Sequence, residues 1–232
     1  MMGSMLDGHR IGALILTGGS GSRFGGDLPK QFLFLCGKRV YLHTLEVFEK
    51  IGLFDEIVLV CHPEWLDIVC QEAPSARIIS GGATRQESAY LGLQGFAKQP
   101  EIVCIHDAVR PFVSPRILQE NVEQALRHGA VDTCIPSADT LVYAPQGKTI
   151  ASIPKREEFL RGQTPQTFRY PLIWHAHQKA LTDQVHATDD CSLVLRQGHP
   201  IHVVAGSEEN IKITTTRDLL LAEALLEIHS TL

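Results

Sequence analysis

A glycine-rich segment directly after a short apolar run constrains this chain more than any other feature. Residues 12–16 form a short apolar run of the kind that makes a buried strand. Residues 16–31 read LTGGSGSRFGGDLPKQ. Five glycines in nine positions leave backbone N–H groups uncovered, and Arg23 and Lys30 add two cations. The segment therefore predicts a loop after a strand that binds phosphate groups.

Two well-known phosphate loops do not fit this segment. The dinucleotide fingerprint needs a third glycine where this chain has Phe24. The Walker loop needs Gly-Lys-Ser/Thr at a spacing that is missing here. The sequence therefore predicts a third kind of phosphate cradle, in which side-chain cations flank bare backbone.

Short apolar runs alternate with helical patterns as far as Pro136. We expect strands at 12–16, 56–61, 76–80, 102–106 and 131–136, and helices at 41–51, 64–72, 86–96 and 115–128. Helices at 172–181 and 190–197, a strand at 201–205 and a last helix capped by Thr216 complete the pattern. This order predicts an α/β fold, with a mostly parallel sheet flanked by helices.

Residues 137–160 break the alternation. Two short strand candidates, 140–142 and 149–153, flank the turn cluster 144–147. A hairpin with so few apolar residues is a β-arm that needs a partner surface, and a second subunit is the natural candidate. We expect one domain over 11–232 that carries this arm, preceded by a tail of residues 1–10.

Composition narrows the classes of protein. The 232 residues suit one domain, and the net charge of −5 argues against a general nucleic-acid binder. The longest apolar runs are too short to span a membrane, and the first ten residues lack a signal-peptide core. The six cysteines form no Cys-x-x-Cys pair, which favours free thiols in a cytoplasmic protein.

The glycine-rich segment also resembles a known family. Gly-Gly-x-Gly-x-Arg at 18–23, followed by Pro-Lys-Gln at 29–31, resembles the signature loop of nucleotidyltransferases that make CDP-polyols. Five further blocks resemble the same enzymes, at 81–88, 106–111, 162–166, 188–190 and 209–214. Over about residues 11–228 the chain is similar to 2-C-methyl-D-erythritol 4-phosphate cytidylyltransferases and ribitol-5-phosphate cytidylyltransferases. The resemblance implies a Rossmann-like nucleotidyltransferase fold with a protruding β-arm used in dimerisation.

The resemblance also implies a reaction and a set of residues. A polyol phosphate attacks the α-phosphorus of CTP and releases pyrophosphate, with Mg²⁺ or another divalent cation bridging the phosphates. The catalytic cations would be Arg23, Lys30 and Lys212. The residues implied in CTP binding are Thr17, Gly18, Gly19, Gly21, Gly81, Gly82, Arg85, Ser88 and Ala108.

The acceptor site follows from the remaining blocks. The implied residues are Asp107, Arg110, Thr140, Arg156, Thr164, Thr188 and Asp189. Asp107 would also contact the metal. Thr140 and Arg156 lie in the arm, so in a homodimer of this family they would serve the neighbouring subunit's site.

The acceptor itself stays open between two polyol phosphates. Residues 139–142 lack the lysine usual in methylerythritol enzymes, and 153–156 and 162–168 look more like the ribitol branch. The methylerythritol enzyme is commoner in bacteria, so 2-C-methyl-D-erythritol 4-phosphate is placed first on that base rate. Ribitol 5-phosphate is the alternative.

Two other classes share parts of the pattern. Sugar-1-phosphate nucleotidyltransferases have a similar first loop, but they are longer and lack the block at 106–111. A non-catalytic nucleotide-binding regulator would have lost Arg23, Lys30 or Lys212, and all three are present.

Overall fold

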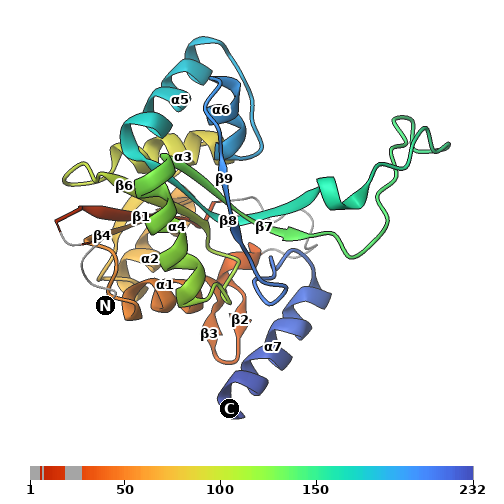
Figure 1. Ribbon diagram of the computed structural model, residues 1–232. Helices are drawn as coiled ribbons and strands as arrows, with labels where there is room; N and C mark the ends of the chain where they lie inside the picture. Colours follow the sequence, from red (N-terminus) through yellow and green to blue (C-terminus); the bar gives the residue numbers. More distant parts are fainter. Residues whose placement is uncertain (1–5, 7, 19–27, 232) are drawn as a thin grey trace.

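A mixed sheet forms the centre of the molecule (Figure 1). The computed structural model describes residues 6, 8–18 and 28–231. Within them the main sheet has seven strands in the order β5-β4-β1-β6-β8-β7-β9. The strands are β1 (Ile11–Leu16), β4 (Glu56–Cys61), β5 (Arg77–Ser80), β6 (Ile102–Asp107), β7 (Ala130–Pro136), β8 (Leu160–Arg169) and β9 (His202–Ala205). Pairing is parallel except around β8, which runs antiparallel to β6 and β7. The predicted mostly parallel sheet is confirmed.

Helices cover both faces of this sheet. They are α1 (Val40–Lys50), α2 (Leu66–Glu72), α3 (Arg85–Gln94), α4 (Pro115–His128), α5 (Tyr170–Thr182) and α6 (Asp190–Arg196), whereas α7 (Thr216–Thr231) extends away from the sheet and packs near residues 34–35 (Figure 1). Their ends agree with the predicted ranges to within about two residues. The predicted cap of α7 is wrong by one position, because the hydroxyl of Thr215 accepts the Asp218 N–H at 3.3 Å. No described helix is both long and apolar enough to cross a membrane.

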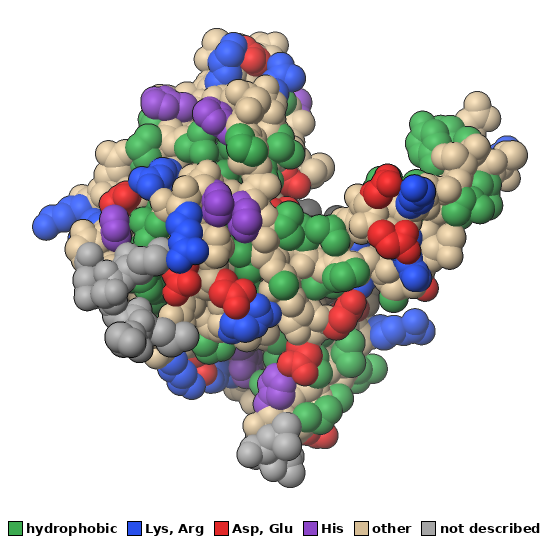
Figure 2. All heavy atoms as spheres, viewed as in Figure 1, with side chains coloured by type: hydrophobic (Ala, Val, Ile, Leu, Met, Phe, Trp, Pro, Cys, Tyr) green, Lys and Arg blue, Asp and Glu red, His purple; other side chains and the backbone are tan. Residues whose placement is uncertain are grey.

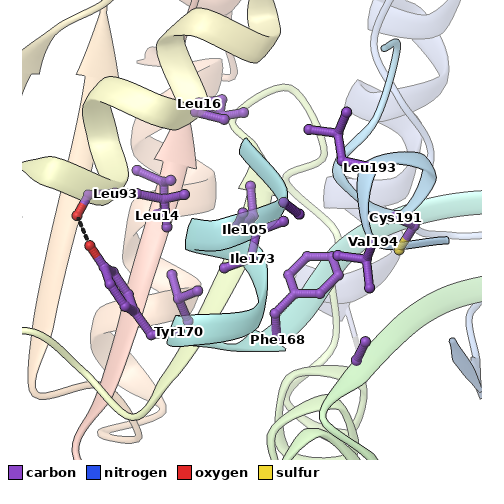
Figure 3. Packing of buried hydrophobic residues seen from close by; sticks show 14 of the residues in the cluster. Leu14, Leu16, Leu93, Ile105, Phe168, Tyr170, Ile173, Cys191, Leu193 and Val194 are labelled. Carbon is purple, nitrogen blue, oxygen red and sulfur yellow. Dashed lines mark hydrogen bonds between the residues drawn. The ribbon is translucent and has the colours of Figure 1, made fainter. Parts of the chain in front are cut away.

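Strand β1 shows how the two layers are held. Leu14 and Leu16 point into a core shared with α3, α5 and α6, whereas Ala13 and Ile15 point into a core shared with α1, α2 and α4. This alternation is the period of two that a strand imposes when both of its faces are buried. Figure 3 shows the first core, in which the Tyr170 hydroxyl donates to the Leu93 carbonyl at 2.8 Å.

Short elements complete the described fold. A small ribbon of β2 (Phe34–Leu35) and β3 (Lys38–Arg39) lies beside α7 in Figure 1. The 3-10 turns are η1 (Lys30–Phe32), η2 (Pro63–Trp65) and η3 (Arg156–Glu158). The turns η1 and η2 lie near the carboxyl ends of β1 and β4, where they shape the functional site.

Strand β8 was not predicted from the sequence. Its residues, LRGQTPQTFR, include glycine, proline and several polar side chains, which are rare in a central strand. They are tolerated because the polar groups find partners inside the fold. Thr133 Oγ1 donates to the Pro165 carbonyl at 2.6 Å, and Gln163 Nε2 donates to the Ser207 carbonyl at 2.8 Å.

The segment 137–159 leaves the body of the molecule as a protruding arm (Figure 1). The two predicted strands are wrong in extent, because the arm contains only one isolated bridge, between Tyr143 and Ser152. Few hydrogen bonds cross the arm: they join Tyr143 to Ala151 and Ser152, at 2.7–3.3 Å. Exposed apolar side chains are visible on the arm in Figure 2; they are Val142, Tyr143, Ile150, Ile153 and Phe159. The arm therefore lacks a core of its own, as predicted.

Candidate active site

Two adjacent pockets open at the carboxyl ends of the parallel strands, where ligands of open α/β sheets bind. The larger, about 370 Å³, is called the glycine pocket; its lining is Gly18, Pro29, His62, Glu64, Trp65, Gly81, Gly82, Ala83, Thr84, Arg85 and Ser88. The smaller, about 120 Å³, is called the charged pocket; its lining is Arg85, Asp107, Arg110, Gly162, Gln163, Thr164, Gln166, Thr188, Asp189 and Lys212. Arg85 lines both pockets.

One wall of the glycine pocket has no room for a side chain. A Cβ atom on Gly81 would lie 3.0 Å from Ser88 Oγ and 3.3 Å from the Cys61 carbonyl oxygen. The Gly81 N–H donates to that same carbonyl at 2.7 Å, which ties the loop to the end of β4. Gly82 N–H donates to Ser88 Oγ at 3.2 Å. The glycines therefore bring bare backbone against the pocket.

The start of α3 fixes the other wall. Thr84 Oγ1 accepts the Glu87 N–H at 3.0 Å, while Glu87 Oε2 accepts the Ala83 N–H at 2.8 Å. This reciprocal pair caps the helix. The Ala83 N–H therefore has a partner in Glu87 before any ligand enters, and the Gly82 N–H has one in Ser88 Oγ.

Sequence reasoning missed the side chains that follow β4. His62, Glu64 and Trp65 line the glycine pocket from η2. Trp65 is held by a stacked contact with Phe32, with ring centroids 4.2 Å apart and planes 20° apart. The available signal was an aromatic residue in a loop directly after a buried parallel strand.

Asp107 is the centre of the charged pocket. Its Oδ2 lies 2.6 Å from Lys212 Nζ, and its Oδ1 lies 3.4 Å from Arg85 Nε. Burial alone would raise the pKa of Asp107, but Arg85 and Lys212 outweigh it and hold the pKa well below its usual range. Asp107 is therefore an anion at neutral pH, and it orients two of the cations that the sequence singled out.

A second buried carboxylate, Asp190, was also missed. Its Oδ2 lies 2.7 Å from Arg85 Nη1, and its side chain is 1% exposed. Burial would raise the pKa of Asp190, but Arg85 and a hydrogen bond from His177 lower it to about 2. The sequence pointed instead to Asp189, which lines the charged pocket and caps α6 by accepting the Ser192 N–H at 2.7 Å. In the Thr-Asp-Asp block, the first aspartate thus caps the helix and the second neutralises Arg85.

Arg110 offers an unused donor near the charged pocket. Its Nη1 donates to the Asn210 carbonyl at 2.7 Å, which fixes the guanidinium. Its Nε is buried and has no hydrogen-bond partner among the described residues. A buried donor of this kind suits an anionic ligand.

His106 and Thr164 form a buried hydrogen-bonded pair next to Asp107 of the charged pocket. His106 Nε2 lies 3.1 Å from the Arg110 carbonyl oxygen, so Nε2 carries the proton and Nδ1 accepts. The Thr164 hydroxyl lies 3.0 Å from that Nδ1 and accepts the Asp107 N–H at 3.1 Å. Thr164 therefore has its hydroxyl proton committed to His106. Burial lowers the pKa of His106 to about 4.

Several predicted residues lie away from the two pockets or outside the description. The Thr17 hydroxyl donates to the Val60 carbonyl at 2.7 Å, and the buried Ala108 donates its N–H to Leu16. Thr140 and Arg156 lie on the arm, where Arg156 Nη1 donates to the Ala138 carbonyl at 3.0 Å. Gly19, Gly21 and Arg23 fall outside the described residues, whereas Lys30 begins η1 directly after Pro29 of the glycine pocket.

Comparison with known proteins gives consistent similarities. The family described as 2-C-methyl-D-erythritol 4-phosphate cytidylyltransferase matches residues 11–228. A protein of that name from Geotalea uraniireducens is 39% identical over 228 residues, which cover 94% of this chain and 97% of that protein. The structure of 4-diphosphocytidyl-2C-methyl-D-erythritol synthase from Anaerococcus prevotii is similar, with a TM-score of 0.87 and 30% identity, covering 97% of this chain and 99% of that chain.

A second solved structure agrees with these similarities. It is 2-C-methyl-D-erythritol 4-phosphate cytidylyltransferase from Thermus thermophilus, with a TM-score of 0.78 and 34% identity. The match covers 93% of this chain and 98% of that chain. The similarity therefore extends over sequence and fold together.

The neutral His106 predicts a pH dependence of stability. Folding lowers the pKa of His106 from 6.5 to about 4. Between these two pH values the unfolded chain therefore binds a proton at this residue and the folded protein does not, so the free energy of unfolding decreases as the pH falls below 6.5. Between pH 7 and pH 5 this loss is about 2 kcal/mol. Asp132, whose pKa burial raises to about 6, acts in the opposite direction.

Comparison with His106→Gln isolates the histidine from Asp132. Urea unfolding at the two pH values should show that the variant lacks this loss of about 2 kcal/mol in its pH dependence. An identical pH dependence in the two proteins would contradict a neutral, buried His106.

Proposed function

We propose, from the premise that this chain belongs to the 2-C-methyl-D-erythritol 4-phosphate cytidylyltransferase family, that its glycine pocket binds CTP and its charged pocket binds the polyol phosphate. The chain is a nucleotidyltransferase of the cytidylyl type. The polyol phosphate attacks the α-phosphorus of CTP, and pyrophosphate leaves. The observation that carries this assignment is Arg85, which lines both pockets and so brings two anionic substrates to one boundary.

Electrostatics and positioning do most of the chemical work. The attacking phosphate is already an anion near pH 7, so no general base is needed. Arg23 and Lys30 hold the triphosphate and stabilise the charge that builds on the α-phosphorus and on the leaving pyrophosphate. Lys212, held by Asp107 at 2.6 Å, approaches the α-phosphate from the opposite side. Cations fixed in this way need little reorganisation when the charge moves.

The nucleotide base fits the bare backbone of the glycine pocket. Gly18, Gly19 and Gly21 would receive the triphosphate, since glycine has no side chain, and Gly81, Gly82 and Ser88 border the base. Thr17 and Ala108 support the pocket from behind, because both hold β1 in place. The proposed preference for a pyrimidine over a purine rests on the backbone of Gly81 and Gly82, which leaves no room for a side chain along this wall.

The acceptor phosphate pairs with Arg110, whose buried Nε has no partner among the described residues. Thr188 and Asp189 contact the polyol hydroxyls from the rim of the charged pocket. Thr164 serves as an acceptor only, since its proton is committed to His106. Thr140 and Arg156 reach this pocket from the arm of a second subunit in a homodimer.

A divalent cation such as Mg²⁺ fits this site through oxygen ligands. Among the described residues no group of three or more His, Cys, Asp or Glu side chains could hold a metal, and substrate phosphates and water would supply most of the ligands. Asp107 is a hard oxygen donor in the charged pocket, and one carboxylate plus substrate phosphates is a common Mg²⁺ arrangement. The bound cation would neutralise phosphate charge during the transfer.

The acceptor is 2-C-methyl-D-erythritol 4-phosphate, as the family and the similar proteins indicate. Ribitol 5-phosphate is not favoured, although the sequence around 139–142 leans toward it. The product, a CDP-polyol, belongs to isoprenoid biosynthesis.

Six cysteines without disulfides support a cytoplasmic location.

Pyrophosphate release tests the proposed function directly. With CTP and 2-C-methyl-D-erythritol 4-phosphate the enzyme should turn over, and kcat/KM should be at least about tenfold higher than with ATP or GTP, a difference of about 1.4 kcal/mol. Ribitol 5-phosphate should be the poorer acceptor in the same assay. Equal kcat/KM for the two acceptors would overturn the choice of acceptor, and equal turnover with ATP would overturn the role of the glycine pocket.

The two loop cations should act mainly on the transition state. Lys30→Ala and Arg23→Ala should each lower kcat by about 10² to 10³, or about 3–4 kcal/mol, with a smaller loss of CTP affinity in calorimetry. Lys98→Ala, at an exposed position, is the control and should change little. Near-native kcat with only weaker CTP binding would show that these cations merely anchor the substrate.

The arm should act across the dimer, which complementation can measure. Arg156→Ala and Lys212→Ala should each be nearly inactive alone. Mixed and reassociated, they should recover up to about a quarter of wild-type activity, because half of the dimers then contain one intact site. Lys155→Ala, at the exposed position next to Arg156, should stay active. No recovery on mixing, or a fully active monomer, would refute the exchange of arms.

A further inference from the structure

A buried histidine lies behind the charged pocket without lining it. His177, on α5, has a side chain that is 1% exposed. Its Nε2 lies 2.9 Å from Asp190 Oδ1, and Asp190 is buried to the same extent. The proposed transfer reaction uses neither side chain directly, so the pair needs a separate explanation.

Contacts run from this histidine to the reacting region. Asp190 uses its second oxygen, Oδ2, to accept from Arg85 Nη1 at 2.7 Å. Arg85 in turn contacts Asp107, and Asp107 contacts Lys212. Each carboxylate thus lies between two donors, and His177 stands at the end of the series farthest from the pockets.

The hydrogen-bonding state of His177 is defined by its surroundings. A carboxylate oxygen accepts, so Nε2 carries the proton and donates to Asp190. The other ring nitrogen, Nδ1, is buried and has no partner among the described residues. A buried ring nitrogen without a partner costs free energy, so packing alone does not explain a histidine at this position. The hydrogen bond that His177 donates to Asp190 is the remaining explanation.

Geometry shows what this hydrogen bond controls. Asp190 is the first residue of α6, and its carboxylate can turn about the Cβ–Cγ bond unless both oxygens are held. His177 holds Oδ1, which fixes the direction in which Oδ2 meets Arg85. The guanidinium of Arg85 is thereby kept between Asp190 and Asp107, at the boundary of the two pockets.

We propose that His177 is a positioning residue, which acts through Asp190 to hold Arg85 at the boundary between the two substrate pockets. Its kinetic consequence rests on the proposed function, since Arg85 borders the acceptor there. The guanidinium of Arg85 donates to Asp107 and to Asp190, and Asp107 lines the charged pocket but not the glycine pocket. Loss of the hydrogen bond should therefore affect the acceptor more than CTP.

Kinetics of two variants separate the hydrogen bond from packing. His177→Phe keeps a ring but removes the donor, and KM for the polyol phosphate should rise about tenfold while the CTP dissociation constant stays within about twofold. His177→Gln places an amide N–H near the position of Nε2 and should return KM to within about threefold of wild type. His175→Phe, on the exposed side of the same helix, is the matched control and should behave as wild type.

A second measurement follows Arg85 without any turnover. The Nε–H proton of Arg85, assigned by NMR through its loss in Arg85→Lys, should exchange with solvent at least tenfold faster in His177→Phe than in the wild type. His177→Gln should restore the slow exchange. If His177→Phe fails to fold, His177→Leu, which also lacks a donor, takes its place in both measurements.

The outcomes decide between the two proposals separately. Native exchange and native KM in the variant without the donor would overturn the positioning role. Equal damage in His177→Phe and His177→Gln would also overturn it, because packing would then explain the residue. A wild-type enzyme that fails to turn over the acceptor would refute the proposed function, whereas the exchange of Arg85 would still test the position of its guanidinium.

Discussion

The need to neutralise a buried anion organises the functional end of this protein. Asp107 ends a central strand, where burial would raise its pKa if no cation were near. Arg85 comes from the start of α3 and Lys212 from the segment after β9, so three distant parts of the chain meet at one carboxylate. Removing either cation would leave buried charge less well compensated, which is costly in a protein interior.

The antiparallel strand β8 forms a wall of the pocket in which these residues meet. It lies between β6 and β7 and carries Gln163, Thr164 and Gln166 into the wall of the charged pocket. Each of these side chains is used inside the fold: Gln163 binds the loop before Asn210, and Gln166 accepts the Asp190 N–H at 3.0 Å. A strand that looks too polar for the interior is thus the element that joins the sheet to the site.

Local patterns predicted the layers well, because burial on both faces leaves a clear mark in the sequence. Strand β4 and helix α4 begin and end at the predicted residues. Pattern failed where tertiary partners outweigh composition, as in the polar strand β8, and where a hairpin lacks a core, as in the arm 137–159. Both failures concern segments whose conformation depends on contacts far away in the chain.

The functional residues divide in the same way. The blocks at 81–88 and 106–111 were recognisable by their resemblance to a known family, and both begin at the end of a predicted strand. Asp190 and His177 were not, since a carboxylate at a helix start and a histidine on a helix are usually exposed or capping groups. Their role became visible only when burial and distances placed them behind Arg85.

Arg85 is shared by two pockets, and this has a thermodynamic consequence. A displacement of its guanidinium that one ligand causes alters the affinity for the other ligand to the extent that this ligand also contacts the guanidinium. Linkage requires this effect to be mutual: the factor by which the nucleotide changes acceptor affinity equals the factor by which the acceptor changes nucleotide affinity. One side chain at a common wall is therefore sufficient to make the two substrates effectors of each other, without any movement of the sheet that carries them.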